Sequence, residues 1–218
     1  MEPRGDSLLS LLPPIRRARG WRLYAEDGRR FLDLWQDDGR GILGAKGTGI
    51  GTLAKAGVDR GLASPLPSVW GERLRKEVLR QQPEWQDALF FPDEGEARDW
   101  LGAQGLSGPI LRPFQEFRAE KLAGAEAAIL RLPCPRALAP GLVLLKTGPG
   151  QNLPPGPLVP PLLLSAAAKG LGEFRGFLQA YTEAHWRKAD RRLSPILERR
   201  GPWLYPRCAP SDYPELFR

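Results

Sequence analysis

Hydrophobic positions near the start of the chain form two short runs that predict a β-hairpin. One run covers residues 21–24 and the other covers residues 31–34, and both have the apolar spacing of a strand with one half-buried face. Asp27-Gly28 lies between them, and this dipeptide favours a tight turn between antiparallel strands. Residues 20–36 are therefore expected to form a hairpin.

Apolar side chains that recur every three to four residues predict the helices. An amphipathic helix is expected over Ser68–Arg80, and a shorter one over Gly95–Gln104. The longest helix is expected from Ser165, which is a suitable capping residue, to about Leu193. A short helix or arm, Ser7–Leu12, would precede the hairpin and end at the prolines that follow it.

Short apolar runs without helical spacing predict the remaining strands. The expected strands are Phe90-Phe91, Ala127–Leu132, Gly141–Leu145 and Trp203–Tyr205. Residues 37–63 are rich in glycine and are expected to be irregular. These elements predict an α+β fold with an N-terminal hairpin and a reduced mixed sheet flanked by helices. The chain divides into residues 1–104 and residues 105–218.

Composition narrows the class of protein. The chain has 218 residues, 42% of them hydrophobic, and a net charge of +7. This charge permits a nucleic acid or another anionic partner. Cys134 and Cys208 fit neither a zinc-site spacing nor a disulfide framework, so no metal site is expected. No apolar run has the length of a membrane span, and Leu8–Leu12 is too short for a signal peptide. We therefore expect a cytoplasmic protein.

Three segments resemble the class III aminotransferases, which are fold-type I enzymes that use pyridoxal phosphate. Gly20–Leu34 resembles the family's opening pattern G-x-x-[LV]-[YW]-D-x-x-G-x-x-[YF]-L-D, with Ala25 in place of the usual Asp. Asp59–Ser68 leads into a helix as it does in the family, and Leu89–Ala97 resembles the family's F-F-x-N-S-G-T-E-A. The resemblance covers roughly the first half of the chain and implies a shortened, degenerate fold-type I architecture.

The resemblance implies a set of groups that a pyridoxal phosphate enzyme needs. A lysine forms the Schiff base, and an acid lies near the pyridine nitrogen. Residues 141–156 resemble the segment that carries the lysine, so Lys146 is the candidate Schiff-base lysine. The competing interpretation is an exposed lysine at the end of a strand. The acid is expected within Ala119–Glu126, but this window lacks the family's Asp-Glu pair.

The phosphate of the cofactor requires backbone amides and hydroxyls at a helix N-terminus. Where the family has Ser-Gly-Thr, this chain has Glu94-Gly95-Glu96. Two carboxylates would repel a dianion, and each like-charge pair at 4 Å costs roughly 4 kcal/mol at an effective dielectric constant near 20. Alternatively, the acidic residues interact favourably with the helix dipole. The chain between Glu96 and Lys146 is also too short for several crossover units of about 30 residues each.

Three functions remain open. The first is a shortened aminotransferase-like protein without independent catalysis, a pseudoenzyme or interaction protein for which no cofactor is expected. The second is a pyridoxal phosphate-dependent aminotransferase completed by a partner subunit. The third is a basic module that binds nucleic acid or an acidic protein, suggested by the charge and by His185–Arg192. A homo-oligomer or a hetero-complex is the expected state, and nucleic acid is not the favoured partner.

Overall fold

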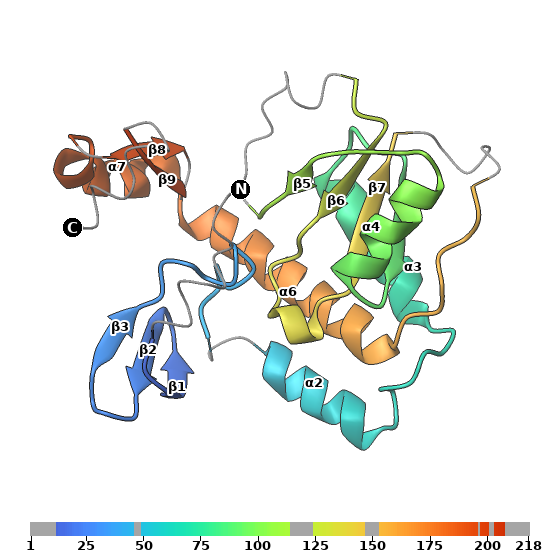
Figure 1. Cartoon of the computed structure of the whole chain (residues 1–218), viewed down its shortest axis with the longest axis horizontal. Helices are drawn as coiled ribbons and strands as arrows, with labels where there is room; N and C mark the ends of the chain where they lie inside the picture. The colour runs from blue at the N-terminus through green and yellow to red at the C-terminus, as the bar shows by residue number, and fades with distance from the viewer. Residues whose placement is uncertain are drawn as a thin grey trace.

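A mixed β-sheet with helices packed against it lies on the right-hand side of Figure 1. The computed structural model describes residues 12–45, 49–113, 124–146, 153–195, 197–200 and 203–207. Within these residues the sheet has the order β4-β7-β6-β5. The strands are β4 (Asp87–Phe91), β5 (Ile110–Leu111), β6 (Ala127–Leu130) and β7 (Gly141–Leu145). β7 runs antiparallel to both of its neighbours, and β5 is parallel to β6.

The two central strands are buried along their whole length, which explains their uninterrupted apolar sequences. Alternate side chains of each strand enter two different hydrophobic clusters. Leu142 and Leu144 face one cluster, and Val143 and Leu145 face the other. This alternation confirms the predicted strands and gives the sheet two apolar faces that helices must cover.

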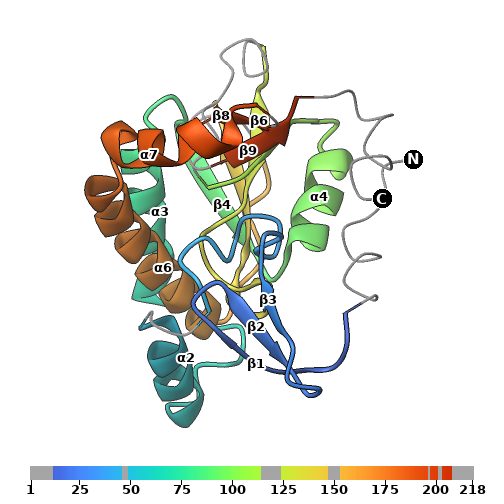
Figure 2. The same cartoon turned by 90° about the vertical axis from the view of Figure 1, so that its left-hand side faces the viewer.

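Helices α3 (Val69–Gln81) and α6 (Pro161–Ala180) cover one face, and α4 (Glu94–Ala103) covers the other (Figure 2). The predicted helices over residues 68–80 and 95–104 are thereby confirmed. The Ser68 hydroxyl caps α3 by accepting a hydrogen bond of 3.3 Å from the Trp70 backbone amide. None of the described helices is both long and apolar enough to cross a membrane.

The prediction of a single long helix over residues 165–193 is wrong, because two helices occupy this region. α6 begins earlier, with Pro161 in its first turn, and the Ser165 hydroxyl donates to the Leu162 carbonyl instead of capping the helix. Tyr181 leaves the helical conformation, and α7 (Glu183–Leu193) begins after Thr182. Tyr181 contacts the rings of Phe177 and His185, so apolar spacing continues across the break and conceals it in the sequence. α6 is still the longest of the described helices.

The N-terminal hairpin is confirmed and has a third strand. β1 (Ile15–Arg19), β2 (Arg22–Ala25) and β3 (Arg30–Leu32) form an antiparallel sheet in that order. Asp27 stabilises the predicted turn by accepting a hydrogen bond from the Arg29 amide, and Gly28 has a φ of +87°. β1 escaped prediction because its sequence is mostly arginine. The predicted arm, residues 7–12, lies outside the described residues except for its last position.

Helix α2 (Ile50–Asp59) lies in the region that we expected to be irregular. Its two internal glycines lower the intrinsic helix propensity, and this weakness hid the helix in the sequence. Packing against α6 compensates, because Ile50, Ala54 and Gly57 are buried and a Cβ at Gly57 would touch Leu162. Packing against α6 therefore outweighs the low helix propensity of the α2 sequence.

The C-terminal part of the described chain is a small unit of its own. The predicted strand at residues 203–205 is confirmed as β9 (Trp203–Pro206), and it pairs with β8 (Leu197–Arg200), which was not predicted. Arg199 binds Glu183 and Asp190 of α7, and these hydrogen bonds lower the pKa of both carboxyls. β4 belongs to residues 1–104 and β5, β6 and β7 to residues 105–218, so both parts of the chain contribute to one sheet.

Candidate functional site

The N-terminus of α4 lies at the edge of the sheet where β4 ends and β7 begins. Phe91, the last residue of β4, pairs with Gly141, the first residue of β7. Asp93 caps the helix by accepting a hydrogen bond of 2.9 Å from the Glu96 amide. A Cβ at position 141 would clash with the Asp93 carbonyl, so glycine is required for this close approach of strand and helix.

Glu94, the first residue of α4, is held by three arginines from three parts of the chain. Arg131, directly after β6, forms a bidentate pair with it, with N–O distances of 2.8 and 2.9 Å. Arg40, from the loop after β3, donates to Glu94 Oε2, and Arg98, one turn along α4, donates to Oε1. Charge-assisted bonds of this kind are among the strongest polar contacts in proteins.

The loop that carries Arg40 has an unusual backbone. Gln36, Asp37 and Asp38 have φ values of 49°, 49° and 56°, so three successive residues other than glycine are left-handed. This conformation costs on the order of 1–2 kcal/mol per residue. Strained loops persist only where their surroundings fix them, and they gather at functional sites.

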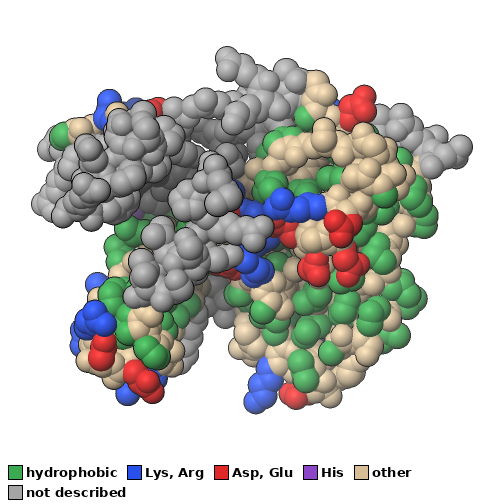
Figure 3. Space-filling view, viewed as in Figure 1, with side chains coloured by type: hydrophobic (Ala, Val, Ile, Leu, Met, Phe, Trp, Pro, Cys, Tyr) green, Lys and Arg blue, Asp and Glu red, His purple; other side chains and the backbone are tan. Residues whose placement is uncertain are grey.

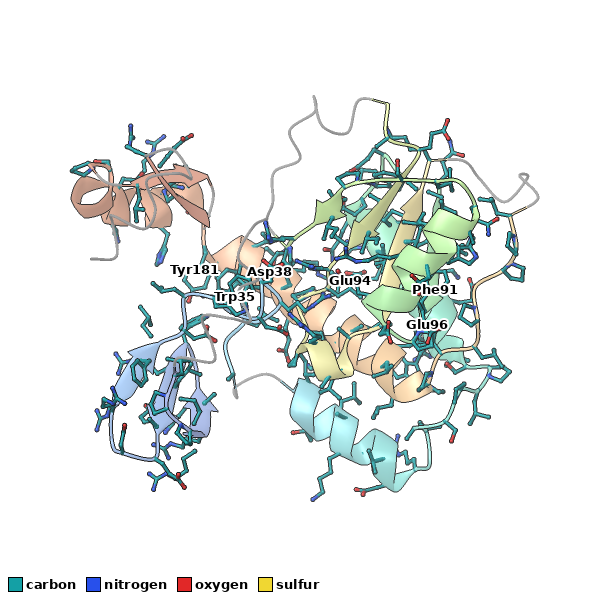
Figure 4. All side chains as sticks on the ribbon, in the orientation of Figure 1. Trp35, Asp38, Phe91, Glu94, Glu96 and Tyr181 are labelled. Carbon is teal, nitrogen blue, oxygen red and sulfur yellow. The ribbon has the colours of Figure 1, made fainter. Side chains whose placement is uncertain are left out.

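Three further ion pairs fix this strained loop. Asp38 binds Arg112 at 2.7 Å and also binds Arg131, and Asp37 binds the side chain and the backbone amide of Arg136, each at 3.0 Å. Figure 4 shows Asp38 and Glu94 in the same central region between the loop and α4. Charged side chains of both signs gather there at the surface (Figure 3).

We name this group of residues the Glu94 cluster. It consists of Asp37, Asp38, Glu94, Arg40, Arg98, Arg112, Arg131 and Arg136. Five guanidiniums therefore surround three carboxylates. Arg40 is only 5% exposed, and burial lowers its pKa while the charge of Glu94 raises it. Without Glu94 this buried cation would lose its main partner.

Lys146 lies at the opposite end of the sheet. Leu145, directly before it, pairs with Asp87 at the start of β4, whereas Glu94 follows the end of β4. A strand of this length spans roughly 14 Å at about 3.4 Å per residue. The Lys146 ammonium lies over the ring of Trp85, 5.6 Å from its centroid, and its amide donates to the Glu126 carbonyl. The structure thus does not bring Lys146 and the α4 N-terminus together.

Arg131 is the strand-end side chain that reaches the α4 N-terminus, and our sequence reasoning missed it. Arg131 lies within the predicted strand Ala127–Leu132, shortly before the turn signal Pro133-Cys134-Pro135. A single charged residue in an otherwise apolar run was the available signal. Glu96 is exposed, and its position in the first turn agrees with the helix-dipole interpretation.

The other residues considered from the sequence lie elsewhere. Cys134 is fully buried beside the Leu138 carbonyl, and burial raises the pKa of its thiol to about 12. His185 is exposed, with its ring edge against Tyr181. Most of the window searched for the acidic residue, and Cys208, lie outside the described residues. The described residues contain no group of three His, Cys, Asp or Glu suited to a metal ion.

Comparison with known proteins places this geometry in context. No model of a known protein family matches the sequence. An uncharacterized protein of Borreliella burgdorferi is 30% identical over 144 residues, which is 63% of this chain and 54% of that protein. The chain therefore spans about half the length of this curated relative.

Solved structures give a clearer result for the fold. An N-acetylornithine aminotransferase from Stenotrophomonas maltophilia matches with a TM-score of 0.55 and 14% identity over 94% of this chain and 84% of that chain. An ornithine aminotransferase from Plasmodium yoelii matches with a TM-score of 0.55 and 11% identity over 92% and 82%. The protein therefore has an aminotransferase-like α+β fold. At these identities the likeness concerns the fold alone.

Replacing Glu94 with Gln should destabilise the protein strongly. The substitution keeps the size of the side chain but removes the charge that compensates buried Arg40 and half of the bidentate pair with Arg131. We expect the free energy of unfolding to fall by at least about 2 kcal/mol. Urea denaturation followed by circular dichroism measures the change. The matched control is Glu96→Gln, which should cost less than about 1 kcal/mol. Equal losses in the two variants would contradict the central role of Glu94.

Cys134 should not react with iodoacetamide in the native protein at pH 8. A folded-state pKa of about 12 keeps the thiol protonated, and the side chain is inaccessible. The raised pKa also means that ionisation favours unfolding as the pH rises above about 8.5, the ordinary thiol value. Peptide mapping by mass spectrometry, with and without guanidinium chloride, measures the alkylated fraction. Rapid alkylation without denaturant would show that the Cys134 site opens.

Proposed function

We propose that this protein is a shortened, degenerate class III aminotransferase-like protein without independent catalysis, which acts through binding to other molecules. The observation that carries the proposal is the Glu94 cluster. In the family that the sequence resembles, the corresponding helix N-terminus receives the phosphate of pyridoxal phosphate. In this chain a carboxylate of the protein itself lies at that helix end and has its own arginine partners.

Electrostatics supports the absence of a bound cofactor. A phosphate dianion at the α4 N-terminus would lie beside the carboxylates of Asp93 and Glu94. Binding there would require Glu94 to give up its pairs with Arg40, Arg98 and Arg131, and the cost of breaking these charge-assisted bonds opposes binding. The residues present therefore do not fit pyridoxal phosphate, and we derive no reaction step that uses it.

The available nucleophiles support the same conclusion. A Schiff base requires an amine that can lose its proton, and Lys146 is at the far end of β7 from the α4 N-terminus. The side chain that does reach this helix end is Arg131, whose guanidinium stays protonated in proteins. Among the described residues, a helix end that could hold the phosphate and a lysine that could form the Schiff base do not occur at the same site.

Treatment with pyridoxal phosphate followed by borohydride tests this proposal. We expect diffuse labelling of lysines such as Lys55, Lys76 and Lys188, with no preference for Lys146, because a surface amine reacts according to its exposure alone. Mass spectrometry of peptides measures the labelled fraction at each lysine.

Stoichiometric labelling of Lys146, together with transamination that Lys146→Ala abolishes and Lys76→Ala does not, would overturn the proposal. The protein would then be an aminotransferase, and a partner subunit would have to complete its site. Lys76 is the matched control because it is an exposed lysine on a helix that packs against the same sheet.

We also propose that the chain associates with a second copy or with another protein. Exposed large apolar side chains occur close together around α2 and the N-termini of α3 and α6. They are Val58, Leu66, Val69 and Leu158, with exposed fractions of 58%, 44%, 63% and 55%. The Leu162 amide donates to the Leu62 carbonyl, so these segments run side by side. In the view of Figure 3, hydrophobic side chains gather at the lower right of the molecule. Such a patch favours association.

Light scattering coupled to size exclusion tests the association. The wild-type protein should exceed the mass of a monomer at micromolar concentration, and Val69→Lys with Leu158→Lys should reduce the mass to that of a monomer, because a buried lysine must be desolvated. Leu34→Lys is the control, because Leu34 is more exposed than either residue, at 76%, but follows β3. A monodisperse monomer of the wild-type protein would contradict the proposal.

A further inference from the structure

Four of the six residues on one face of the N-terminal sheet are arginines. Residues paired across antiparallel strands point to the same face, and so do residues two apart along a strand. The resulting rows are Arg17–Tyr24–Arg30 and Arg19–Arg22–Leu32. We call these six residues the arginine face. The opposite face carries Ala18, Leu23 and Phe31, which are half-buried.

The charges of this face have no counter-ions within the described residues. Arg17, Arg19, Arg22 and Arg30 are all exposed, and none of them lies within ion-pair distance of a described carboxylate. The acidic residues of the hairpin follow the strands. Glu26 and Asp27 are at the turn, where Asp27 binds Arg29, and Asp33 follows β3 and accepts a hydrogen bond from the Gln36 amide. The face therefore presents four positive charges to solvent.

Stability does not explain this arrangement. Arg19 and Arg22 are direct cross-strand partners, and like charges in such positions destabilise a sheet. Arg17 and Arg30 both lie over the ring of Tyr24, at 4.4 and 5.9 Å from its centroid. Stacking on an aromatic ring holds a guanidinium in place while its N–H donors, which lie in the plane of the group, are still available.

The chemistry of the face matches a repeated phosphate. Guanidinium groups bind phosphate oxygens with two parallel hydrogen bonds. Arginines two residues apart on a strand are about 7 Å from each other, so a single small anion would engage only part of the face. An acidic protein would require apolar contacts as well, and Leu32 is the one aliphatic side chain in the two rows.

We propose that the arginine face binds the phosphate backbone of single-stranded nucleic acid and does not read its base sequence. A flexible strand can follow the guanidiniums across this sheet, and a net charge of +7 attracts it from a distance. This proposal does not depend on the proposed lack of catalysis. The arginine face lies on β1, β2 and β3, whereas the residues of the Glu94 cluster lie on other segments of the chain.

Fluorescence anisotropy with labelled oligothymidylate tests the proposal. Contact of all four arginines with phosphates predicts that the logarithm of the binding constant falls with the logarithm of salt concentration, with a slope of about −3. The variant Arg19→Gln with Arg22→Gln should reduce the magnitude of this slope by about half. Its thermal stability should be equal to or higher than that of the wild-type protein, because a repulsive pair is removed.

The matched control is Lys55→Gln with Lys76→Gln, which removes the same charge from exposed positions of α2 and α3 and should leave the slope unchanged. If the double arginine variant does not fold, Arg22→Gln alone should reduce the slope by about a quarter. Wild-type affinity and slope in the folded arginine variant would overturn the proposal. Equal or tighter binding to duplex DNA, to polyglutamate or to phosphatidylserine vesicles would also overturn it, in favour of that ligand.

Discussion

The carboxylate of Glu94 joins parts of the chain that are far apart in sequence. Arg40 comes from the loop after the N-terminal sheet, Arg131 from the end of β6, and Arg98 from the helix that Glu94 itself begins. Asp38 extends this connection, because Arg131 binds it as well. The left-handed conformation of residues 36–38 is costly, and these ion pairs supply the compensation. The attachment of the loop to the sheet therefore depends on a small number of charge-assisted bonds.

The position of this carboxylate also has a chemical consequence. A helix N-terminus attracts anions, and an aminotransferase-like fold offers such a terminus at the edge of its central sheet. In this protein the negative charge at the α4 N-terminus is provided by Glu94, and the side chain of Asp93 caps the helix. Satisfying a helix end internally stabilises the fold. Under the proposed function, the same carboxylate also occupies the position at which a phosphate would otherwise be held.

The sequence predicted well where local patterns dominate and poorly where distant contacts decide. Continuous apolar runs identified β6 and β7, and the helical spacing of Trp70, Leu74 and Val78 identified α3. α2 and β1 were missed, because α2 depends on burial against α6 and β1 on pairing with β2. The position of Lys146 relative to Glu94 could not be predicted from the sequence, for a topological reason. Nothing in the sequence reveals that β7 is antiparallel to β4, and this direction places Lys146 at the opposite end of the sheet from Glu94.

The central position of β7 also constrains how the chain reaches its native state. β7 hydrogen-bonds to β4 and β6, and β4 precedes it by more than fifty residues. During synthesis, β4 therefore emerges from the ribosome without its partner and must wait until Gly141–Leu145 has been translated. Contacts of such long sequence separation slow folding and expose apolar strands in the meantime. α3 and α4 flank β4 in sequence and contact it, so they can bury its apolar side chains before β7 has been synthesised.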